Sequence, residues 1–474
     1  MMGPLTSLIG SALARTPAMV VDGDGTAVTG RELLASAKVL AHGLTAARIG
    51  RGDPVLCRIA NQPTDLVALL AVWLAGGVAV PVSATAARAT VIGIEGATGA
   101  RLGLEAGRVQ ELSPAPAPAR RGLEQAALIV FTSGSTGKPK GVVLGQQQLA
   151  GKLDVLNRLI KLRGDDTVVV ALRLSFIFGI WVSLLAILSG ARLVVCEKFS
   201  ADGLAARLAA GASVAAVLPT MLRSMVLAPA PPAPRLRSIL SGGETLLARL
   251  GNETAQAFPA AGIYDLYGLT ETGSCDFCLS PAEFAIGLGS IGQPTEQVDY
   301  RIVDQQHRPV AAGAAGELMI KTPFGMLGYL DEPQLTADSY HEGFFATGDA
   351  ARMRRDGRVE LVGRLKDIIV RGGNKIAPAE IDALLATHPE VRGALCGGVP
   401  DPRLGEAMHA VVALTPGSEL TGQALRSWAA ARIEAYKVPD VIHIRDQLPT
   451  GGTGKLDRTA VARLALAGRQ AEAG

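Results

Sequence analysis

The polar segment from Phe131 to Gly141 has the composition of a phosphate-binding loop. It reads Phe-Thr-Ser-Gly-Ser-Thr-Gly-Lys-Pro-Lys-Gly and follows an apolar run, Ala126 to Phe131, that is typical of a strand. Glycines let backbone N–H groups approach an anion closely, while hydroxyl groups and lysines add donors and positive charge. The P-loop NTPase pattern does not fit, because Pro139 follows Lys138 and the glycine spacing differs. A flexible surface loop is the alternative, but such a linker rarely carries Lys-Pro-Lys-Gly directly before an apolar strand.

Four further polar clusters follow in the chain. The first, Tyr264 to Thr272, mixes aromatic, hydroxyl and carboxylate groups: Tyr267 suits stacking on a base, Thr270 suits a phosphate and Glu271 suits a hard cation. The others are Phe345–Asp349, with a carboxylate suited to ribose hydroxyls, Gly363–Gly373, and Gly451–Arg458, with Lys455 on a glycine-rich loop. A mobile lysine suits a phosphate or carboxylate partner. Taken singly, each cluster is also explained as a turn with capping residues.

The elements around these clusters predict an α/β protein of two or more domains. Pro54–Ile59, Thr64–Ala75 and Val78–Val82 read as strand, helix and strand, which indicates a parallel sheet. Thr29 with Glu32 three residues later predicts a capping box at a helix start. From residue 290 short alternating runs predict a small β-rich subdomain. After residue 366 the pattern becomes compact α+β, so we expect an N-terminal domain over 1–365 and a C-terminal domain over 366–474.

Composition and charge narrow the class of protein. The formal net charge is only +3, so nothing calls for nucleic acid or an anionic membrane as partner. The five cysteines are too scattered for a disulfide framework, which favours a reducing cytoplasm, and the C-x-x-C of Cys275 and Cys278 lacks further ligands nearby. We expect that pair to line a pocket wall.

The uncharged run Leu174–Ala191 is expected to be a buried core element rather than a membrane span, and the N-terminus is a poor signal peptide.

The order and spacing of the five clusters resemble the adenylate-forming superfamily, which includes acyl- and aryl-CoA synthetases, the adenylation domains of peptide synthetases and beetle luciferases. The resemblance covers about Thr16 to Arg458. Further agreement comes from four short segments: Gly328-Tyr329, Pro378–Ile381, Val399–Pro402 and Tyr436–Pro439.

The resemblance implies a role for each cluster. It places the ATP β- and γ-phosphates against the opening loop: Thr132, Ser133, Gly134, Ser135, Thr136, Gly137, Lys138 and Lys140. It implies an adenine slot of Gly242, Gly243, Glu244, Asp265 and Tyr267, an α-phosphate contact by Thr270, Mg²⁺ binding by Glu271, and ribose contacts by Asp349 and Arg364. It also implies a hinge at Lys366, a thiol channel at Gly372 and Gly373, and a catalytic lysine, Lys455, between the substrate carboxylate and the α-phosphate.

The expected acyl pocket departs from the amino-acid-activating members. Those members carry an Asp in a Phe-Asp pair on the strand that lines the pocket; here Ile177 takes the Asp position, and no acidic residue occurs from Thr167 to Val195. A buried ammonium without a partner is costly. We therefore expect an aromatic, branched or medium-chain acid without an α-amino group. Phe176, Trp181 and Gly268 are expected to line the pocket, with ordinary core packing as the alternative for the aromatic residues.

The resemblance thus implies an ATP-dependent acid–thiol ligase that uses ATP, Mg²⁺ and CoA. One alternative acceptor is the phosphopantetheine arm of a stand-alone carrier protein. Another alternative is a non-catalytic nucleotide-binding relative, against which the joint presence of Glu271, Asp349, Arg364 and Lys455 argues. A homodimer is compatible with the family. A second departure from the family is Gly145-Gln146, where the family often has Thr/Ser-His. The sequence alone does not reveal the consequence of this difference.

Overall fold

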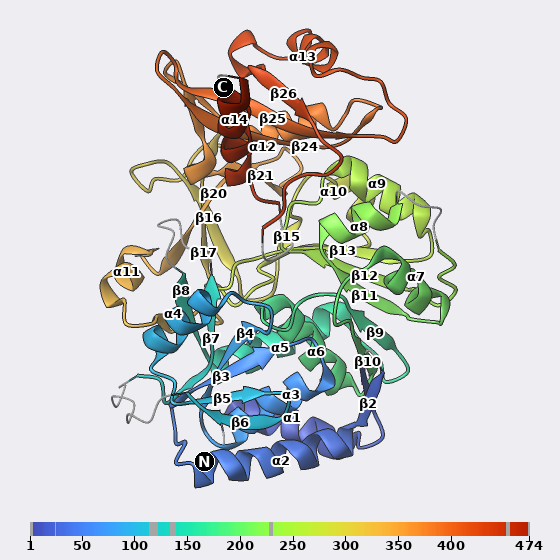
Figure 1. Ribbon diagram of the computed structural model, residues 1–474, viewed down its shortest axis with the longest axis vertical. Coiled ribbons are helices and arrows are strands. Elements are labelled where there is room, and N and C mark those ends of the chain that lie inside the picture. Colours follow the sequence, from blue (N-terminus) through green and yellow to red (C-terminus); the bar gives the residue numbers. More distant parts are fainter. Residues whose placement is uncertain are drawn as a thin grey trace.

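The computed structural model describes residues 3–23, 25–112, 122–132, 139–226, 231–451 and 456–472 (Figure 1). Two large sheets and their helices form the lower part of the molecule in Figure 1, and the C-terminal unit, from β22 (Ile369–Arg371) to α14 (Thr459–Glu472), lies above them. This arrangement agrees with the α/β architecture expected from the sequence.

The first large sheet has nine strands within the described ranges, in the order β15-β14-β13-β12-β11-β9-β10-β1-β2. These are β15 (Gln293–Pro294), β14 (Phe277–Leu279), β13 (Gly262–Tyr267), β12 (Ser238–Gly242), β11 (Val214–Val217), β9 (Thr167–Val170), β10 (Arg192–Val195), β1 (Val20–Gly23) and β2 (Thr26–Thr29). The six strands from β13 to β1 are mutually parallel. Polar residues that follow β12 and β13 therefore meet at one edge of the sheet.

The second large sheet, in the part of the chain that is described, runs β18-β8-β7-β4-β3-β5-β6. Its strands are β18 (Gly328–Tyr329), β8 (Lys140–Gly145), β7 (Ala126–Thr132), β4 (Val78–Ser83), β3 (Pro54–Ile59), β5 (Leu102–Glu105) and β6 (Arg108–Glu111). Strand β3 pairs in parallel with β4, and helix α3 (Pro63–Leu74) joins them, so the expected βαβ unit is confirmed.

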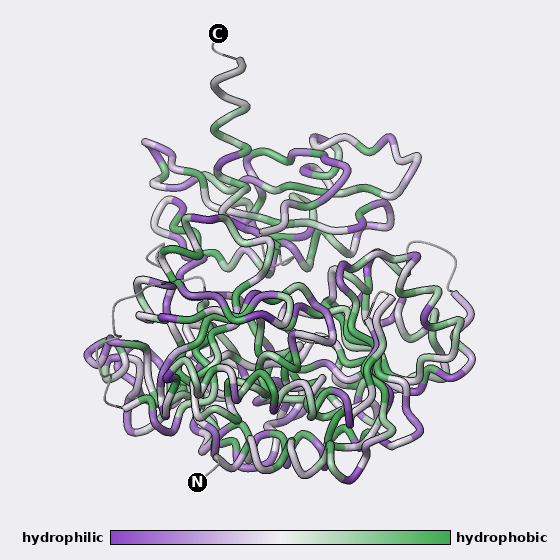
Figure 2. Tube along the Cα trace, turned by 60° about the horizontal axis from the view of Figure 1, so that its bottom comes forward, coloured by the Kyte–Doolittle hydropathy of each residue, from purple (hydrophilic) through white to green (hydrophobic). Residues whose placement is uncertain are grey.

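Helices cover both large sheets. One core contains residues of both sheets and of α1 (Pro4–Arg15), α2 (Gly30–Ala46), α3, α5 (Gln146–Ile160) and α6 (Ile177–Ser189). The outer faces are covered by α4 (Arg88–Thr98), α7 (Ala201–Ala209), α8 (Pro219–Val226) and α9 (Ala248–Ala257). Because both faces of the parallel strands are buried, the strands are apolar throughout rather than alternating. Figure 2 shows the hydrophobic segments gathered in this interior.

Local signals account for several helix ends. Helix α2 begins with the expected capping box, in which Thr29 N donates to Glu32 Oε2 at 2.7 Å and Glu32 N donates to Thr29 Oγ1 at 3.2 Å. Helix α6 lies within the uncharged run Leu174–Ala191 and is buried as expected; it begins at Ile177. Among the helices of the described residues, none is both long and apolar enough to cross a membrane.

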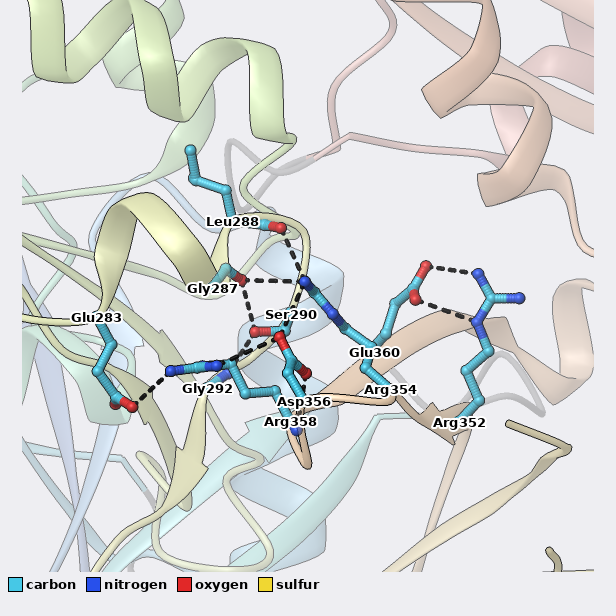
Figure 3. Close-up of polar contacts among 10 residues, drawn as sticks. All are labelled: Glu283, Gly287, Leu288, Ser290, Gly292, Arg352, Arg354, Asp356, Arg358 and Glu360. Atoms are coloured by element: carbon cyan, nitrogen blue, oxygen red, sulfur yellow. Dashed lines mark hydrogen bonds and ion pairs between the residues drawn. The ribbon is translucent and has the colours of Figure 1, made fainter. Parts of the chain in front are cut away.

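A small antiparallel sheet follows, made of β16 (Asp299–Val303), β17 (Ala315–Lys321), β19 (Tyr340–His341), β20 (Phe344–Met353) and β21 (Val359–Arg364). Figure 3 shows the turn between β20 and β21 against helix α10 (Phe284–Gly287). Arg354 Nη1 donates to Leu288 O at 3.0 Å, and Arg358 Nη2 pairs with Glu283 at 2.6 Å. These contacts fix the small sheet against the segment that leads into β15.

The C-terminal unit has its own core. Its elements after β22 are β23 (Asn374–Ile376), α12 (Pro378–Leu385), β24 (Val391–Asp401), β25 (Gly405–Leu414), α13 (Gly422–Ala430), β26 (Val441–Ile444) and α14. A short 3-10 helix, Leu365–Asp367, connects this unit to β21. The expected domain boundary at 365/366 stays a prediction.

Two buried polar contacts tie α5 to distant parts of the chain. Gln146 Oε1 accepts from Thr6 N and Oγ1 of α1, both at 3.2 Å, so the unusual Gln146 anchors the first helix. Lys152 Nζ lies 3.3 Å from Asp276 Oδ1, and both side chains are almost fully buried. Burial raises the pKa of Asp276, whereas the Lys152 charge opposes that increase.

We predict that Lys152→Met destabilises the protein by about 3–5 kcal/mol, because it leaves the Asp276 carboxylate buried and unpaired. Urea denaturation followed by tryptophan fluorescence measures the change. The matched control is Arg158→Met on the same helix, since Arg158 forms exposed ion pairs with Asp154 and Glu296 and such pairs contribute about 1 kcal/mol or less. Equal loss of stability in both variants would contradict the importance of the buried pair.

Candidate active site

The centre of the candidate site is a cluster of Tyr267, Asp349 and Arg364. The Tyr267 hydroxyl donates to Asp349 Oδ2 at 2.6 Å, and Arg364 Nε lies 3.1 Å from Asp349 Oδ1. Tyr267 ends β13, whereas Asp349 and Arg364 face each other as register partners on β20 and β21. Three residues that the sequence places in separate clusters are thus brought together at the edge where the parallel strands end.

The electrostatics of this cluster favour a polar ligand. Burial raises the pKa of Asp349, while Arg364 and the Tyr267 hydroxyl partly offset that increase. Burial, with the Asp349 charge, raises the pKa of Tyr267 well above its usual value, so the phenol stays protonated and donates. The Asp349 side chain is 7% exposed and the Arg364 side chain 55%, so the arginine is the part of the pair that faces solvent.

A second cluster links Glu271 to the opening loop. Tyr329 of β18 donates its hydroxyl to Glu271 Oε1 at 3.2 Å, and Lys140 Nζ lies 5.2 Å from the centre of the Tyr329 ring. Lys140 is the register partner of Thr132 across the β7–β8 hairpin. Tyr329 therefore connects the residue expected to bind the cation with Lys140, at one end of the expected phosphate loop.

Several expected site residues lie outside the described residues. These are Ser133, Gly134, Ser135, Thr136, Gly137 and Lys138 of the phosphate loop, and Lys455. Of the flanking residues, Thr132 ends β7 and Lys140 begins β8. Leu456, next to Lys455, forms an isolated antiparallel bridge with Thr450.

The residues of the expected adenine slot lie in two different places: in or next to the strands β12 and β13, and at a contact with the C-terminal unit. Gly242 ends β12, where an added Cβ would lie 2.5 Å from Leu266 O, and Gly243 has a φ of +83°, so both positions require glycine. Asp265 is buried in β13, and burial raises its pKa to about 8. The Glu244 carboxylate, in contrast, accepts from Thr220 N at 3.1 Å and from Leu456 N at 3.0 Å, which joins it to the C-terminal unit.

The expected hinge and thiol-channel residues are exposed. Lys366 lies in the 3-10 helix that connects the units. Gly372 and Gly373 form the two-residue turn between β22 and β23, with φ of +55° and +83°. Positive φ at both central residues matches a tight hairpin turn that glycine favours.

The expected acyl-pocket residues lie around the start of α6. Phe176 is the N-cap residue and Ile177 the first helical residue of α6. Trp181 is buried, stacks on Phe178 with ring centres 5.1 Å apart, and donates from Nε1 to Ser274 Oγ at 3.4 Å. At Gly268 an added Cβ would lie 2.3 Å from Cys275 N, so close packing against its own loop requires glycine there.

The loop after Thr270 has a backbone that the sequence did not indicate. Gly273, Ser274 and Cys275 have φ of +82°, +70° and +51°. Two of the three are not glycine, and that conformation costs free energy unless the surroundings hold it. Lys152 supplies one such contact by donating to Cys275 O at 3.1 Å. All five cysteines are free and buried, and the pocket-wall position expected for Cys275 and Cys278 stays a prediction.

Glu271 is suited to hold a cation that the phosphates of a substrate bind as well. Among the described residues, no three His, Cys, Asp or Glu side chains lie close enough to form a protein-only metal site. A single half-buried carboxylate suits Mg²⁺, which proteins often bind through one or two carboxylates together with substrate phosphates.

Comparisons with known proteins agree with this geometry. The family model described as AMP-binding enzyme matches residues 11–330, and that of the AMP-binding enzyme C-terminal domain matches 380–455. Feruloyl-CoA synthase of Amycolatopsis sp is 32% identical over 469 residues, which cover 93% of this chain and 94% of that protein. The fatty acid–[acyl-carrier-protein] ligase ScoC of Streptomyces coeruleorubidus is 32% identical over 69% of this chain and 65% of that protein. The crystal structure of ATP-bound MatB from Rhodopseudomonas palustris shares the fold, with a TM-score of 0.86, 24% identity and coverage of 98% and 99%.

We predict that Asp349→Asn weakens ATP binding about 10- to 100-fold, the effect of losing hydrogen bonds to a charged group. The fold should be kept, since the substitution removes a buried charge. Isothermal titration calorimetry gives the affinity, and circular dichroism checks the fold. Asp338→Asn on α11 (Pro333–Asp338) is the control, because that carboxylate accepts from Gln334 on the surface. Unchanged affinity in Asp349→Asn would argue against a ribose contact.

Proposed function

The chain belongs to the AMP-binding enzyme family, and from that membership we propose that it is an ATP-dependent acid–thiol ligase. It activates a carboxylic acid as acyl-AMP with release of pyrophosphate, then transfers the acyl group to the thiol of CoA. The observation that carries the proposal is the convergence of Tyr267, Asp349 and Arg364, since Asp349 offers carboxylate oxygens to ribose hydroxyls beside a tyrosine ring suited to adenine. The likeness to feruloyl-CoA synthase over 93% of the chain supports it.

In the first half-reaction a carboxylate oxygen attacks the α-phosphorus of ATP, and the bond from that phosphorus to the β-phosphate oxygen breaks. Two anions must approach each other, and negative charge builds on the phosphoryl oxygens. We assign Lys455 to bridge the carboxylate and the α-phosphate, and Thr270 to contact the same phosphate. The loop from Thr132 to Lys140 holds the leaving pyrophosphate through its N–H groups and lysines. Mg²⁺ bound at Glu271 would neutralise phosphate charge.

In the second half-reaction the CoA thiol attacks the acyl carbon, its proton is released and AMP leaves. We propose that the C-terminal unit rotates about Lys366 between the two steps. The rotation removes Lys455 from the site and brings the Gly372-Gly373 turn toward the thiol. The exposure of both the hinge and this turn supports that assignment.

The substrate acid is proposed to lack an α-amino group. Ile177 is buried at the start of α6, where the amino-acid-activating members carry an Asp. An ammonium group there would be desolvated without a partner. Phe176 and the stacked pair of Phe178 and Trp181 favour an apolar acyl group, aromatic, branched or of medium chain length.

A carrier protein is the second candidate acceptor. The likeness to ScoC, whose name gives an acyl-carrier-protein as its acceptor, supports this alternative. The cytoplasmic location and the homodimer expected from the sequence stay predictions.

We predict that Lys455→Ala abolishes acid-dependent exchange of labelled pyrophosphate into ATP but largely spares thioester formation from supplied acyl-adenylate. The reason is that the lysine acts on the carboxylate and α-phosphate only in the first half-reaction. Both reactions are measured with one purified variant, and Lys375→Ala is the control because Lys375 is an exposed lysine of the same unit. Equal loss of both half-reactions would contradict the assignment of Lys455.

We predict that a panel of aryl, aliphatic and amino acids gives the highest exchange rate with an acid that has no α-amino group. The same reactions, continued with CoA or with a phosphopantetheinylated carrier protein and followed by mass spectrometry, separate the two acceptors. Best exchange with a free α-amino acid would overturn the interpretation of Ile177.

A further inference from the structure

The Glu244 carboxylate joins the two units of the molecule. One of its oxygens, Oε2, accepts from Thr220 N at 3.1 Å, and the other, Oε1, accepts from Leu456 N at 3.0 Å. Thr220 belongs to the first turn of α8 in the N-terminal unit, and Leu456 is the residue after Lys455. One carboxylate therefore bridges the N-terminal unit and the backbone next to the proposed catalytic lysine.

The contact to α8 fixes Glu244 in place. The first N–H groups of a helix have no partner within the helix, and a carboxylate at that end also interacts favourably with the helix dipole. Glu244 satisfies one of these groups. Its orientation is therefore set by the N-terminal unit, and Oε1 presents an acceptor to whatever docks there.

The segment that reaches Glu244 is itself held firmly by the C-terminal unit. Thr450 and Leu456 form a β-bridge, and Asp457 N donates to Pro449 O at 2.9 Å. Arg458 donates to Cys396 O and pairs with the buried Asp382 at 2.7 Å. Leu456 can therefore leave Glu244 only if this part of the C-terminal unit moves with it.

A second contact lies on the helix that follows Glu244. Arg249 of α9 donates from Nη1 to the carbonyl oxygens of Ala386, His388 and Val391 at 2.9–3.1 Å. Ala386 is the C-cap of α12, so the guanidinium binds a carbonyl group at the end of that helix together with two carbonyl groups of the following segment. Glu253, one turn along α9, holds Arg249 Nε at 2.8 Å. Figure 1 shows α9 directly below the C-terminal unit.

The interface around Arg249 is polar and incompletely packed. A cavity of about 60 Å³ lies between the units, lined in part by Arg223, Arg249, Glu253 and Arg392. Burial in this interface lowers the pKa of Arg223. Interfaces of this polar kind are typical of units that move relative to each other.

We propose that Glu244 and Arg249 are positioning residues that dock the C-terminal unit in the orientation required for adenylation. The inference rests on the proposed function. Glu244 holds the backbone of Leu456, which follows Lys455 in the sequence, and Arg249 fixes the orientation of the unit through the end of α12. Both contacts must break when the unit rotates for thiol transfer. In this proposal Glu244 positions the segment that carries the catalytic lysine. The family resemblance implies a different role, contact with the adenine base.

The test compares Glu244→Gln and Arg249→Ala with wild type and Lys455→Ala in both half-reactions. In Glu244→Gln one acceptor oxygen becomes an NH₂ group, so the two N–H groups cannot both be satisfied. We expect the maximal rate of acid-dependent pyrophosphate exchange to fall about 10- to 100-fold in each variant, the factor expected for hydrogen bonds to a charged group. The KM for ATP and the rate of thioester formation from supplied acyl-adenylate should stay within about twofold of wild type.

The matched control is Glu296→Gln, because Glu296 pairs with Arg158 within the N-terminal unit. It should exchange at the wild-type rate. A raised KM for ATP with slower use of acyl-adenylate in Glu244→Gln would assign that residue to the adenine slot and overturn the proposal. Wild-type exchange in both variants would also overturn it while leaving the ligase function intact. Absence of exchange in wild type with every acid would instead reject the ligase function.

Discussion

The hydrogen bond from Tyr267 to Asp349 is the contact on which the rest of the site depends. Tyr267 ends a strand of the nine-stranded sheet, and Asp349 lies in the small antiparallel sheet, so this bond joins side chains from two different sheets. Arg364, paired to Asp349, is two residues before the proposed hinge, Lys366. This group of three side chains therefore connects the proposed nucleotide site, the small sheet and the start of the connection to the C-terminal unit. The arginine contacts to α10 in Figure 3 hold the same hairpin from its other end.

A second constraint comes from the reaction itself. Two anions have to meet, and the lysine assigned to bring them together lies on a different unit from the phosphate loop. In the proposed mechanism the C-terminal unit must therefore be docked accurately for the first step and released for the second. Contacts made by backbone N–H and C=O groups suit this requirement, because they fix orientation without a large apolar interface that would be costly to separate. Glu244 and Arg249 both bind backbone groups of the C-terminal unit.

Local signals in the sequence predicted the parts of the structure that depend on neighbouring residues. The capping box of Thr29 and Glu32 and the βαβ unit from Pro54 to Ser83 are confirmed because periodicity and capping act within a few residues. The exact start of the buried helix α6, at Ile177, could not be predicted, since a short apolar run does not distinguish a strand from the start of a buried helix. The bond between Gln146 and Thr6, 140 residues apart, and the Lys152–Asp276 pair depend on tertiary packing that no local pattern encodes.

The central claim is that the carboxylate attacks the α-phosphorus and that the loop after Thr132 holds a leaving pyrophosphate. The most direct measurement supplies an accepted acid with both carboxylate oxygens labelled with ¹⁸O and follows the label by mass spectrometry after thioester formation. Attack at the α-phosphorus transfers one ¹⁸O to AMP, keeps the other in the thioester carbonyl and leaves pyrophosphate unlabelled. Label in orthophosphate together with formation of ADP would show transfer of the γ-phosphoryl group instead, and would contradict the account.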